Sequence, residues 1–201
     1  MNSSSLHNAF DIIPPEIILK GYKEGYFPMA ESNNGKVYWY FADPRAIIPL
    51  DTVKIHKSVR QTIRREQLHF KVDSNFKEVI RKCAQRDETW ISEEIIKSYI
   101  NLYNMGYAHS VETYKDDKLV GGLYGVALGG AFFGESMFNE MSNASKAAFF
   151  YLVYHLNQKG FILLDSQFIN EHTKLLGAIE IPAKEYLQIL KKAIELPVTF
   201  L

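Results

Sequence analysis

The sequence contains a single cysteine, Cys83, so it cannot form an internal disulfide bond or a metal site built from several cysteines. No apolar run approaches the roughly 20 residues that a helix needs to cross a bilayer. The N-terminal segment MNSSSLHNAF also lacks the basic-then-apolar layout of a signal peptide. We therefore expect a soluble cytoplasmic protein in which Cys83 is a small buried apolar residue.

Neither sign of charge is in excess, because 23 Lys and Arg residues balance 23 Asp and Glu residues. The molecule as a whole therefore lacks the character of a basic nucleic-acid-binding domain. Local charge differs, since residues 54–65 contain no acidic side chain and carry cations at Lys57, Arg60, Arg64 and Arg65. One face of a helix here could contact phosphate groups, although an ordinary solvated helix face would have the same composition.

Common motifs of nucleotide, metal and hydrolase chemistry are also missing. There is no GxxxxGK[ST] phosphate loop, no GxGxxG after a strand, no HExxH metal motif and no GxSxG nucleophile elbow. We expect neither a bound metal nor a cofactor.

The chain does contain enough apolar residues for a substantial core, with 47% hydrophobic residues in 201. We expect a small N-terminal domain over residues 1–50 and a larger domain over residues 51–201. The small domain is predicted to hold a short helix that starts at Pro14 and ends near Gly25, and a single strand over residues 37–41.

The larger domain alternates between the two-residue period of strands and the 3.6-residue period of helices. Strands are predicted over residues 68–72, 108–114, 118–127, 131–138 and 161–165, and helices over residues 54–65, 76–83, 93–105, 143–158 and from Pro182 onward. Turn signals between the three central strands predict an antiparallel meander. The order indicates an α+β fold and resembles the acyltransferase fold of the GNAT superfamily.

One acidic residue interrupts an apolar strand. In the segment AFFGESMF, Glu135 directly follows Gly134, and a carboxylate in such surroundings is costly unless it meets a partner or a ligand. It could instead point into water or pair with a buried cation. We treat Glu135 as a candidate site residue.

The segment FILLDSQ ends a predicted buried strand with Asp165 and Gln167. Their side chains point the same way if the extended geometry continues through Ser166. Strand ends commonly present functional groups, although Asp165 could equally cap the following turn.

The two tryptophans, Trp39 and Trp90, lie beside polar or turn-forming residues rather than inside apolar stripes. Either ring could be a platform on which a nucleic-acid base stacks. Packing in a core or an interface is the commoner use of tryptophan.

The segments GYFPM, WYFADPR, TWIS, AHSVE, LVGGLYGV, FFGESMF, NASK, DSQ and HTKLLGA follow one another in this order between about Glu16 and Leu190. This series resembles the leucyl/phenylalanyl-tRNA–protein transferase family. The resemblance implies a GNAT-like fold and a reaction without ATP, metal or cofactor. In that reaction a leucyl or phenylalanyl ester, with methionyl as a further candidate, passes from tRNA to the N-terminal Arg or Lys of an acceptor protein, marking it for N-end-rule degradation.

The resemblance also implies roles for individual residues. Gln167 would accept a hydrogen bond or proton from the attacking amine, and Asp165 would polarise it. Because a neutral amide is a very weak base, we expect Gln167 to orient the amine and the proton to leave to water or to the ribose. Glu135 would hold the cationic N-terminus or the ribose. The implied substrate-binding residues are Trp90, Trp39, Phe132, Met137, Leu123 and Ser136, and the basic helix would contact tRNA.

Several positions depart from the family pattern. Met29 stands where a tryptophan is usual after Phe-Pro, which removes one expected stacking surface. Much of the N-terminal extension common in the family is also missing, and we expect the protein to act as a monomer.

Two other functions remain open. An acetyl-CoA-dependent GNAT acetyltransferase would share the element order, but the SNASK segment before the helix over residues 143–158 lacks the glycine-rich loop that holds pyrophosphate. A non-catalytic tRNA-binding module would explain the aromatic content but not Glu135, Asp165 and Gln167 together.

Overall fold

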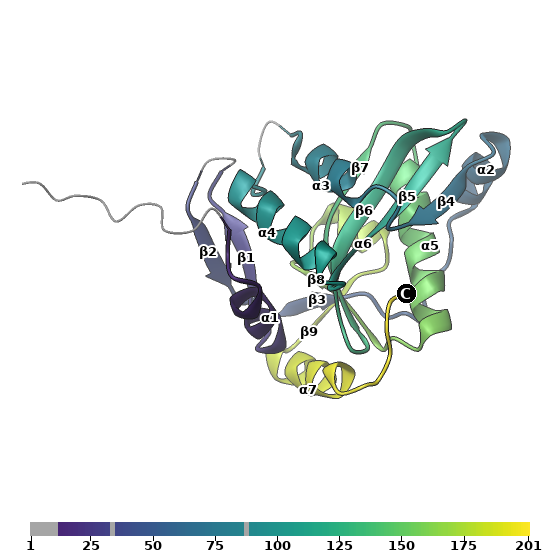
Figure 1. Cartoon of the computed structure of the whole chain (residues 1–201). Coiled ribbons are helices and arrows are strands. Elements are labelled where there is room, and N and C mark those ends of the chain that lie inside the picture. Colours follow the sequence, from purple (N-terminus) through teal and green to yellow (C-terminus); the bar gives the residue numbers. More distant parts are fainter. Residues whose placement is uncertain (1–11, 33–34, 87–88) are drawn as a thin grey trace, which may run out of the picture.

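The computed structural model describes residues 12–32, 35–86 and 89–201, and its strands form two sheets (Figure 1). The smaller sheet pairs β1 (Phe27–Ala30) with β2 (Val37–Tyr40) in antiparallel fashion. The larger sheet has the order β4-β5-β6-β7-β8-β3-β9. Its strands are β3 (Arg45–Ile47), β4 (His69–Val72), β5 (Ala108–Lys115), β6 (Lys118–Leu128), β7 (Ala131–Asn139), β8 (Leu163–Gln167) and β9 (Ile179–Ile181).

The centre of the large sheet is the antiparallel meander β5-β6-β7. Asp116 and Asp117, both with positive φ, turn the chain between β5 and β6, and Gly129 with φ +53° does so between β6 and β7. Asp and Gly tolerate this left-handed backbone better than most residues.

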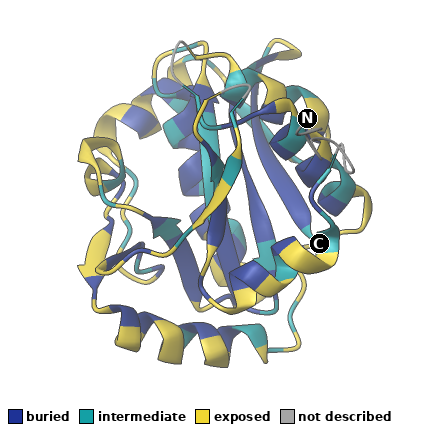
Figure 2. Ribbon diagram, turned by 90° about the vertical axis from the view of Figure 1, so that its left-hand side faces the viewer, coloured by how far each residue is buried: buried dark blue, intermediate teal, exposed yellow. Residues whose placement is uncertain are grey.

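Helices cover both faces of the sheet, as the alternation along β6 requires. Tyr124 packs in the cluster that includes α1 (Pro15–Lys23), α3 (Phe76–Ala84), α4 (Glu93–Asn104) and α7 (Ala183–Ile194). Its neighbour Leu123 packs in the cluster of α2 (Lys57–Arg65) and α5 (Ala144–Lys159). Figure 2 shows buried residues along the sheet and exposed residues on the outer sides of the helices.

The strands β7 and β8 diverge near the middle of the sheet. They pair in parallel from Ala131 opposite Leu163 to Phe133 opposite Asp165, where the register ends. On its other side β7 has an irregularity opposite Tyr124 and Gly125, which leaves Glu135 out of the register with β6. A bulge re-aims a side chain and bends the strand, so Glu135 lies where the two strands diverge.

The predicted α+β class, the meander and the long helices are confirmed. The prediction of a single strand in the N-terminal part was wrong, because β1 and β3 are also present there. The predicted strand over residues 161–165 lies two residues later, as β8. The sequence analysis also missed β9 and α6 (Glu171–Leu175). The division at residue 50 stays a prediction, although β3 already belongs to the large sheet.

Candidate active site

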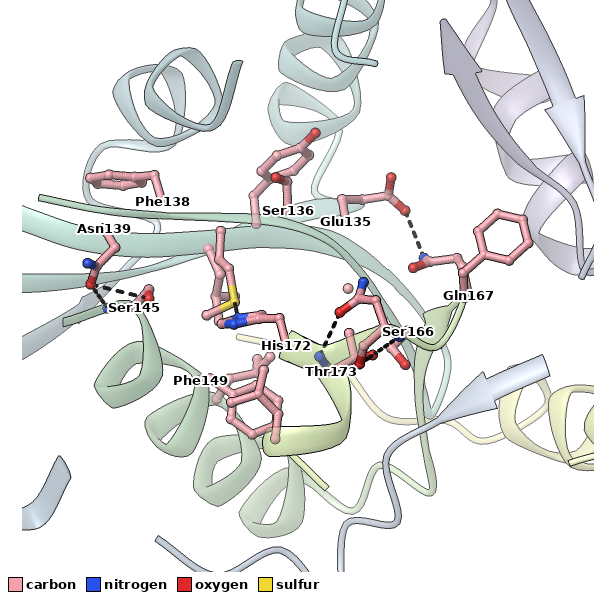
Figure 3. Close-up of a pocket in the computed structure, with 18 of the residues that line it drawn as sticks. Glu135, Ser136, Phe138, Asn139, Ser145, Phe149, Ser166, Gln167, His172 and Thr173 are labelled. Atoms are coloured by element: carbon pink, nitrogen blue, oxygen red, sulfur yellow. Dashed lines mark hydrogen bonds between the residues drawn. The ribbon is translucent and has the colours of Figure 1, made fainter. Parts of the chain in front are cut away.

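A pocket of about 760 Å³ lies where β7 and β8 diverge (Figure 3). This volume is in the usual range for small-molecule sites. One part of its wall is apolar and consists of Ile48, Leu123, Met137, Phe149, Leu152, Leu164 and Leu176. Another part combines Glu135 and Gln167 with the rings of Phe27, Trp90 and Phe168. The lining of this pocket therefore includes an apolar part and a polar and aromatic part, which we call its two chambers.

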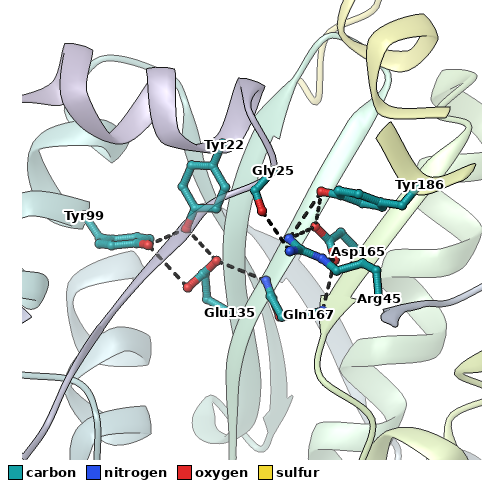
Figure 4. Close-up of polar contacts among 8 residues, drawn as sticks. All are labelled: Tyr22, Gly25, Arg45, Tyr99, Glu135, Asp165, Gln167 and Tyr186. Atoms are coloured by element: carbon teal, nitrogen blue, oxygen red, sulfur yellow. Dashed lines mark hydrogen bonds and ion pairs between the residues drawn. The ribbon is translucent and has the colours of Figure 1, made fainter. Parts of the chain in front are cut away.

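Glu135 is held by two tyrosines from different helices (Figure 4). The hydroxyl of Tyr22 in α1 lies 2.6 Å from its Oε1, the hydroxyl of Tyr99 in α4 lies 3.3 Å from its Oε2, and the two hydroxyls are also in contact with each other. Each hydroxyl carries a single proton, so the tyrosines donate two of these three hydrogen bonds at a time. Burial raises the pKa of Glu135 to about 7, with a further contribution from Asp165, while the tyrosine hydrogen bonds oppose the rise. Glu135 can therefore exchange a proton near neutral pH.

The tyrosines themselves stay protonated. Burial, followed by the nearby Glu135, raises the pKa of both Tyr22 and Tyr99 well above the ordinary tyrosine value. Both hydroxyls thus keep the proton that they can donate, to the carboxylate or to each other, across the physiological pH range.

Gln167 reaches the same carboxylate from the other side of the opening. Its Nε2 donates to Oε1 of Glu135 at 3.4 Å. The backbone of Gln167 has φ +59°, a left-handed conformation that residues other than glycine rarely adopt. The expected extended geometry thus ends at this residue. Its backbone N–H donates to Oδ1 of Asp165 at 2.9 Å.

Asp165 also borders the pocket, but it is fully buried and its carboxylate is paired with a cation. Arg45 of β3 donates to Oδ1 from Nε at 2.9 Å and to Oδ2 from Nη2 at 2.6 Å. Tyr186 of α7 donates to Oδ2 at 2.7 Å. Two parallel bonds from a guanidinium to a carboxylate fix both partners firmly.

The structure brings most of the predicted site residues to the pocket but not all of them. Those that line it are Glu135, Ser136, Met137, Leu123, Trp90, Asp165 and Gln167. Phe132 does not line it, because its buried ring packs against Phe200 with ring centroids 5.2 Å apart. Trp39 packs over Gly21 of α1, where an added Cβ would lie 2.2 Å from the indole ring. The substrate-binding roles of Phe132 and Trp39 stay predictions that the pocket geometry does not favour.

Sequence reasoning missed several residues of this site. Tyr22 and Tyr99 fit the apolar faces of α1 and α4, and only the hydroxyl oxygen of each ring hints at a polar partner. Arg45 lies in a turn-rich segment, and the carboxylate that it binds is 120 positions away in the sequence. His172 of α6 was also missed, and its Nε2 lies 3.0 Å from the sulfur of Met137 at the pocket. Burial, with Lys146 and Arg86 nearby, lowers the pKa of His172, so this ring is neutral near pH 7.

The predicted tRNA-binding cations lie on α2. Lys57, Arg60 and Arg64 are exposed there, while Arg65 forms an ion pair with Glu66 at 2.7 Å. Their contact with phosphates stays a prediction.

Within the part of the chain that the structure describes, none of the helices has the length and apolar character of a membrane span.

Comparisons with known proteins bear on nearly the whole chain. Residues 47–191 match the family model described as leucyl/phenylalanyl-tRNA protein transferase, and residues 11–43 match the model of the N-terminal domain of that family. The leucyl/phenylalanyl-tRNA–protein transferase of Gloeobacter violaceus is 53% identical over 94% of this chain and 97% of its own length. That of Chlorobaculum tepidum is 48% identical over 94% of this chain and 100% of its own length.

A solved structure supports the fold alone. The fold of this chain matches that of a chain described as a GCN5-related glucosamine N-acetyltransferase region in a fungal multi-domain GH3 β-N-acetylglucosaminidase. The match has a TM-score of 0.53 and 9% sequence identity, and covers 89% of this chain and 24% of that one. The expected GNAT-like architecture is thereby confirmed.

Proposed function

Since this chain belongs to the leucyl/phenylalanyl-tRNA–protein transferase family, we propose that its pocket joins leucine or phenylalanine from aminoacyl-tRNA to the N-terminus of an acceptor protein. Because the chain belongs to this family, it is an aminoacyltransferase. The observation that carries the assignment of the site is the contact between Glu135 and Gln167 beside the apolar chamber.

The two chambers suit the two halves of an aminoacyl-adenosine. Leucine and phenylalanine side chains are apolar and differ in shape, and a chamber that contains the flexible thioether of Met137 can adapt to both. Trp90 offers a ring on which the terminal adenine can stack. The ester between them would then lie near Glu135 and Gln167.

Peptide-bond formation needs a neutral amine, whereas a protein N-terminus is partly protonated near pH 7. In our proposal the ammonium transfers one proton to the carboxylate of Glu135. The amine then attacks the ester carbon, the bond from that carbon to the ribose oxygen breaks, and the second proton that the nitrogen loses passes to the ribose oxygen. Gln167 orients the amine through its amide oxygen, because its Nε2 already points at Glu135. An ester is already activated, so no ATP is required.

The finer features of the proposal come from the family resemblance of the motifs. They are a preference for acceptors beginning with Arg or Lys, methionine as a further donor, a monomeric cytoplasmic enzyme and a role in N-end-rule degradation. A carboxylate at Glu135 supports recognition of a cationic N-terminus. Transfer RNA would contact the exposed cations of α2.

The test is an incubation of the purified protein with radiolabelled leucyl-, phenylalanyl-, methionyl- or arginyl-tRNA, without ATP or acetyl-CoA. The acceptor is one protein prepared with N-terminal Arg and, as the matched control, with N-terminal Ala. We expect label from leucyl- and phenylalanyl-tRNA on the Arg form alone. Transfer from arginyl-tRNA would revise the donor, and equal labelling of the Ala form would remove the acceptor preference.

The GNAT-like fold keeps an acetyltransferase as a second candidate. Radiolabelled acetyl-CoA with the same two acceptors tests it directly. Label from acetyl-CoA together with none from any aminoacyl-tRNA would replace the proposed reaction.

A further inference from the structure

We propose that Arg45 is a positioning residue for the transfer reaction, which fixes Asp165 and, through it, Gln167. This inference rests on the proposed function, in which Gln167 orients the attacking amine. Arg45 lies 120 positions before Asp165 in the sequence, on the strand that pairs with β8.

The guanidinium of Arg45 is enclosed on all sides. Its Nη1 donates to the carbonyl oxygen of Gly25 at 2.8 Å, while Nε and Nη2 hold the two oxygens of Asp165. The rings of Phe27 and Tyr186 lie over it at 4.8 and 4.4 Å. Burial alone would lower the pKa of Arg45, but Asp165 reverses this effect and raises it, so the cation is permanent.

Asp165 has no oxygen left for a substrate. Oδ1 accepts from Arg45 Nε and from the backbone N–H of Gln167, and Oδ2 accepts from Arg45 Nη2 and from the hydroxyl of Tyr186. A carboxylate offers about four acceptor positions, so these bonds saturate it. Asp165 therefore acts through Gln167 rather than on the reacting atoms.

The bond from the Gln167 backbone to Asp165 matters because the conformation of Gln167 is unfavourable. A left-handed φ of +59° persists in a non-glycine residue only when its surroundings impose it. In this conformation the side chain turns toward Glu135. Arg45 thus holds the acceptor of the bond that fixes the Gln167 backbone.

The guanidinium of Arg45 also holds the segment after α1, on the side of the site that contains Glu135. Gly25, whose carbonyl oxygen it binds, is the second residue after α1, and α1 carries the Tyr22 that hydrogen-bonds to Glu135. One buried cation therefore links the segment that positions Glu135 to the segment that positions Gln167 (Figure 4).

The experiment is a double-mutant cycle measured as kcat and as KM for aminoacyl-tRNA. Arg45→Lys keeps the charge but loses the two-pronged geometry, and Tyr186→Phe removes one bond to Asp165 while keeping the ring. We expect Arg45→Lys to lower kcat by at least about tenfold and Tyr186→Phe by about threefold, both with KM nearly unchanged. In a Gln167→Ala background Tyr186→Phe should lower kcat by less than about twofold, and Arg45→Lys should lower it by clearly less than in the wild-type protein, because only its effect through Gly25 remains.

The outcomes separate this inference from the function on which it rests. Wild-type kcat in folded Tyr186→Phe and Arg45→Lys proteins, or equal losses with and without Gln167, would overturn the inference. Wild-type kcat in Gln167→Ala alone would instead refute the role of Gln167. If Arg45→Lys does not fold, Tyr186→Phe carries the test. Arg81→Lys, in the exposed pair of Arg81 with Glu93, is the matched control.

Discussion

The Nε2 of Gln167 and the Oε1 of Glu135 lie 3.4 Å apart across the opening between β8 and β7. This contact joins a neutral amide to a carboxylate with a pKa near 7, whereas Asp165 is enclosed by Arg45 and Tyr186. Of these two carboxylates, Glu135 is therefore the one placed to exchange a proton with a substrate.

A first prediction concerns the pH dependence of the reaction. If Glu135 accepts the proton of the amine, kcat/KM should rise with pH through about 7, the pKa of Glu135. Glu135→Gln should lower kcat by about 100-fold and remove this inflection. In Glu135→Gln, kcat/KM should instead rise with the acceptor α-amine, whose pKa is about 8, because only an amine that is already neutral can then react. An unchanged inflection near 7 in Glu135→Gln would assign it to another group.

A second prediction concerns stability. Folding raises the pKa of Glu135, so the stability that this group contributes is complete below its unfolded value of 4.5 and is lost as pH rises through about 7. Relative to Glu135→Gln, the wild-type protein should lose at most about 3 kcal/mol of unfolding free energy between pH 4.5 and 8. Urea unfolding of both proteins at several pH values measures the difference. Parallel stability curves would contradict the raised pKa.

A third prediction separates the backbone of Gln167 from its side chain. Glycine adopts positive φ without strain, so Gln167→Gly should be more stable than Gln167→Ala by about 1 kcal/mol. Both variants should have strongly reduced kcat, because both lack the amide. Thermal unfolding measures the difference in stability between the two variants, and single-turnover transfer measures their loss of activity. High turnover in Gln167→Gly would show that only the backbone matters.

The long elements were predictable from the sequence because each buries a face with its own period. The short strands β1, β3 and β9 were not, since three or four residues carry too little pattern and their pairing depends on segments far away. β3, for example, lies between β8 and β9, which come more than a hundred residues later.

The residues of the site likewise divide into those that the sequence could reveal and those that it could not. Glu135 could be found because a carboxylate among apolar residues conflicts with its surroundings. The roles of Tyr22 and Tyr99 could not, because their rings satisfy the apolar pattern of α1 and α4 and only the fold brings their hydroxyls to Glu135. Asp165 was found as a polar strand end, but its partner Arg45 is visible only in three dimensions.

A fourth prediction concerns tRNA binding by α2. Replacing Lys57, Arg60 and Arg64 together by Gln should raise KM for aminoacyl-tRNA and make it less dependent on salt, by about one unit of slope for each phosphate that the variant no longer binds. Transfer from a short aminoacylated CCA oligonucleotide should not change. The matched control is the same replacement of Lys184, Lys191 and Lys192, which are exposed on α7. An identical salt slope in the α2 variant and the wild-type protein would remove α2 from the tRNA-binding surface.

The last prediction distinguishes the two tryptophans. Trp90 lines the pocket, so Trp90→Ala should lose a stacking surface and raise KM for aminoacyl-tRNA by about tenfold or more. Trp39 packs over Gly21 of α1, so Trp39→Ala should chiefly lower stability, by about 3 kcal/mol or less because its ring is partly exposed. Thermal unfolding of both variants measures the loss of stability, and steady-state kinetics measures the change in KM. A larger change in KM for Trp39→Ala than for Trp90→Ala would mean that the adenosine binds at Trp39 on β2, outside the pocket.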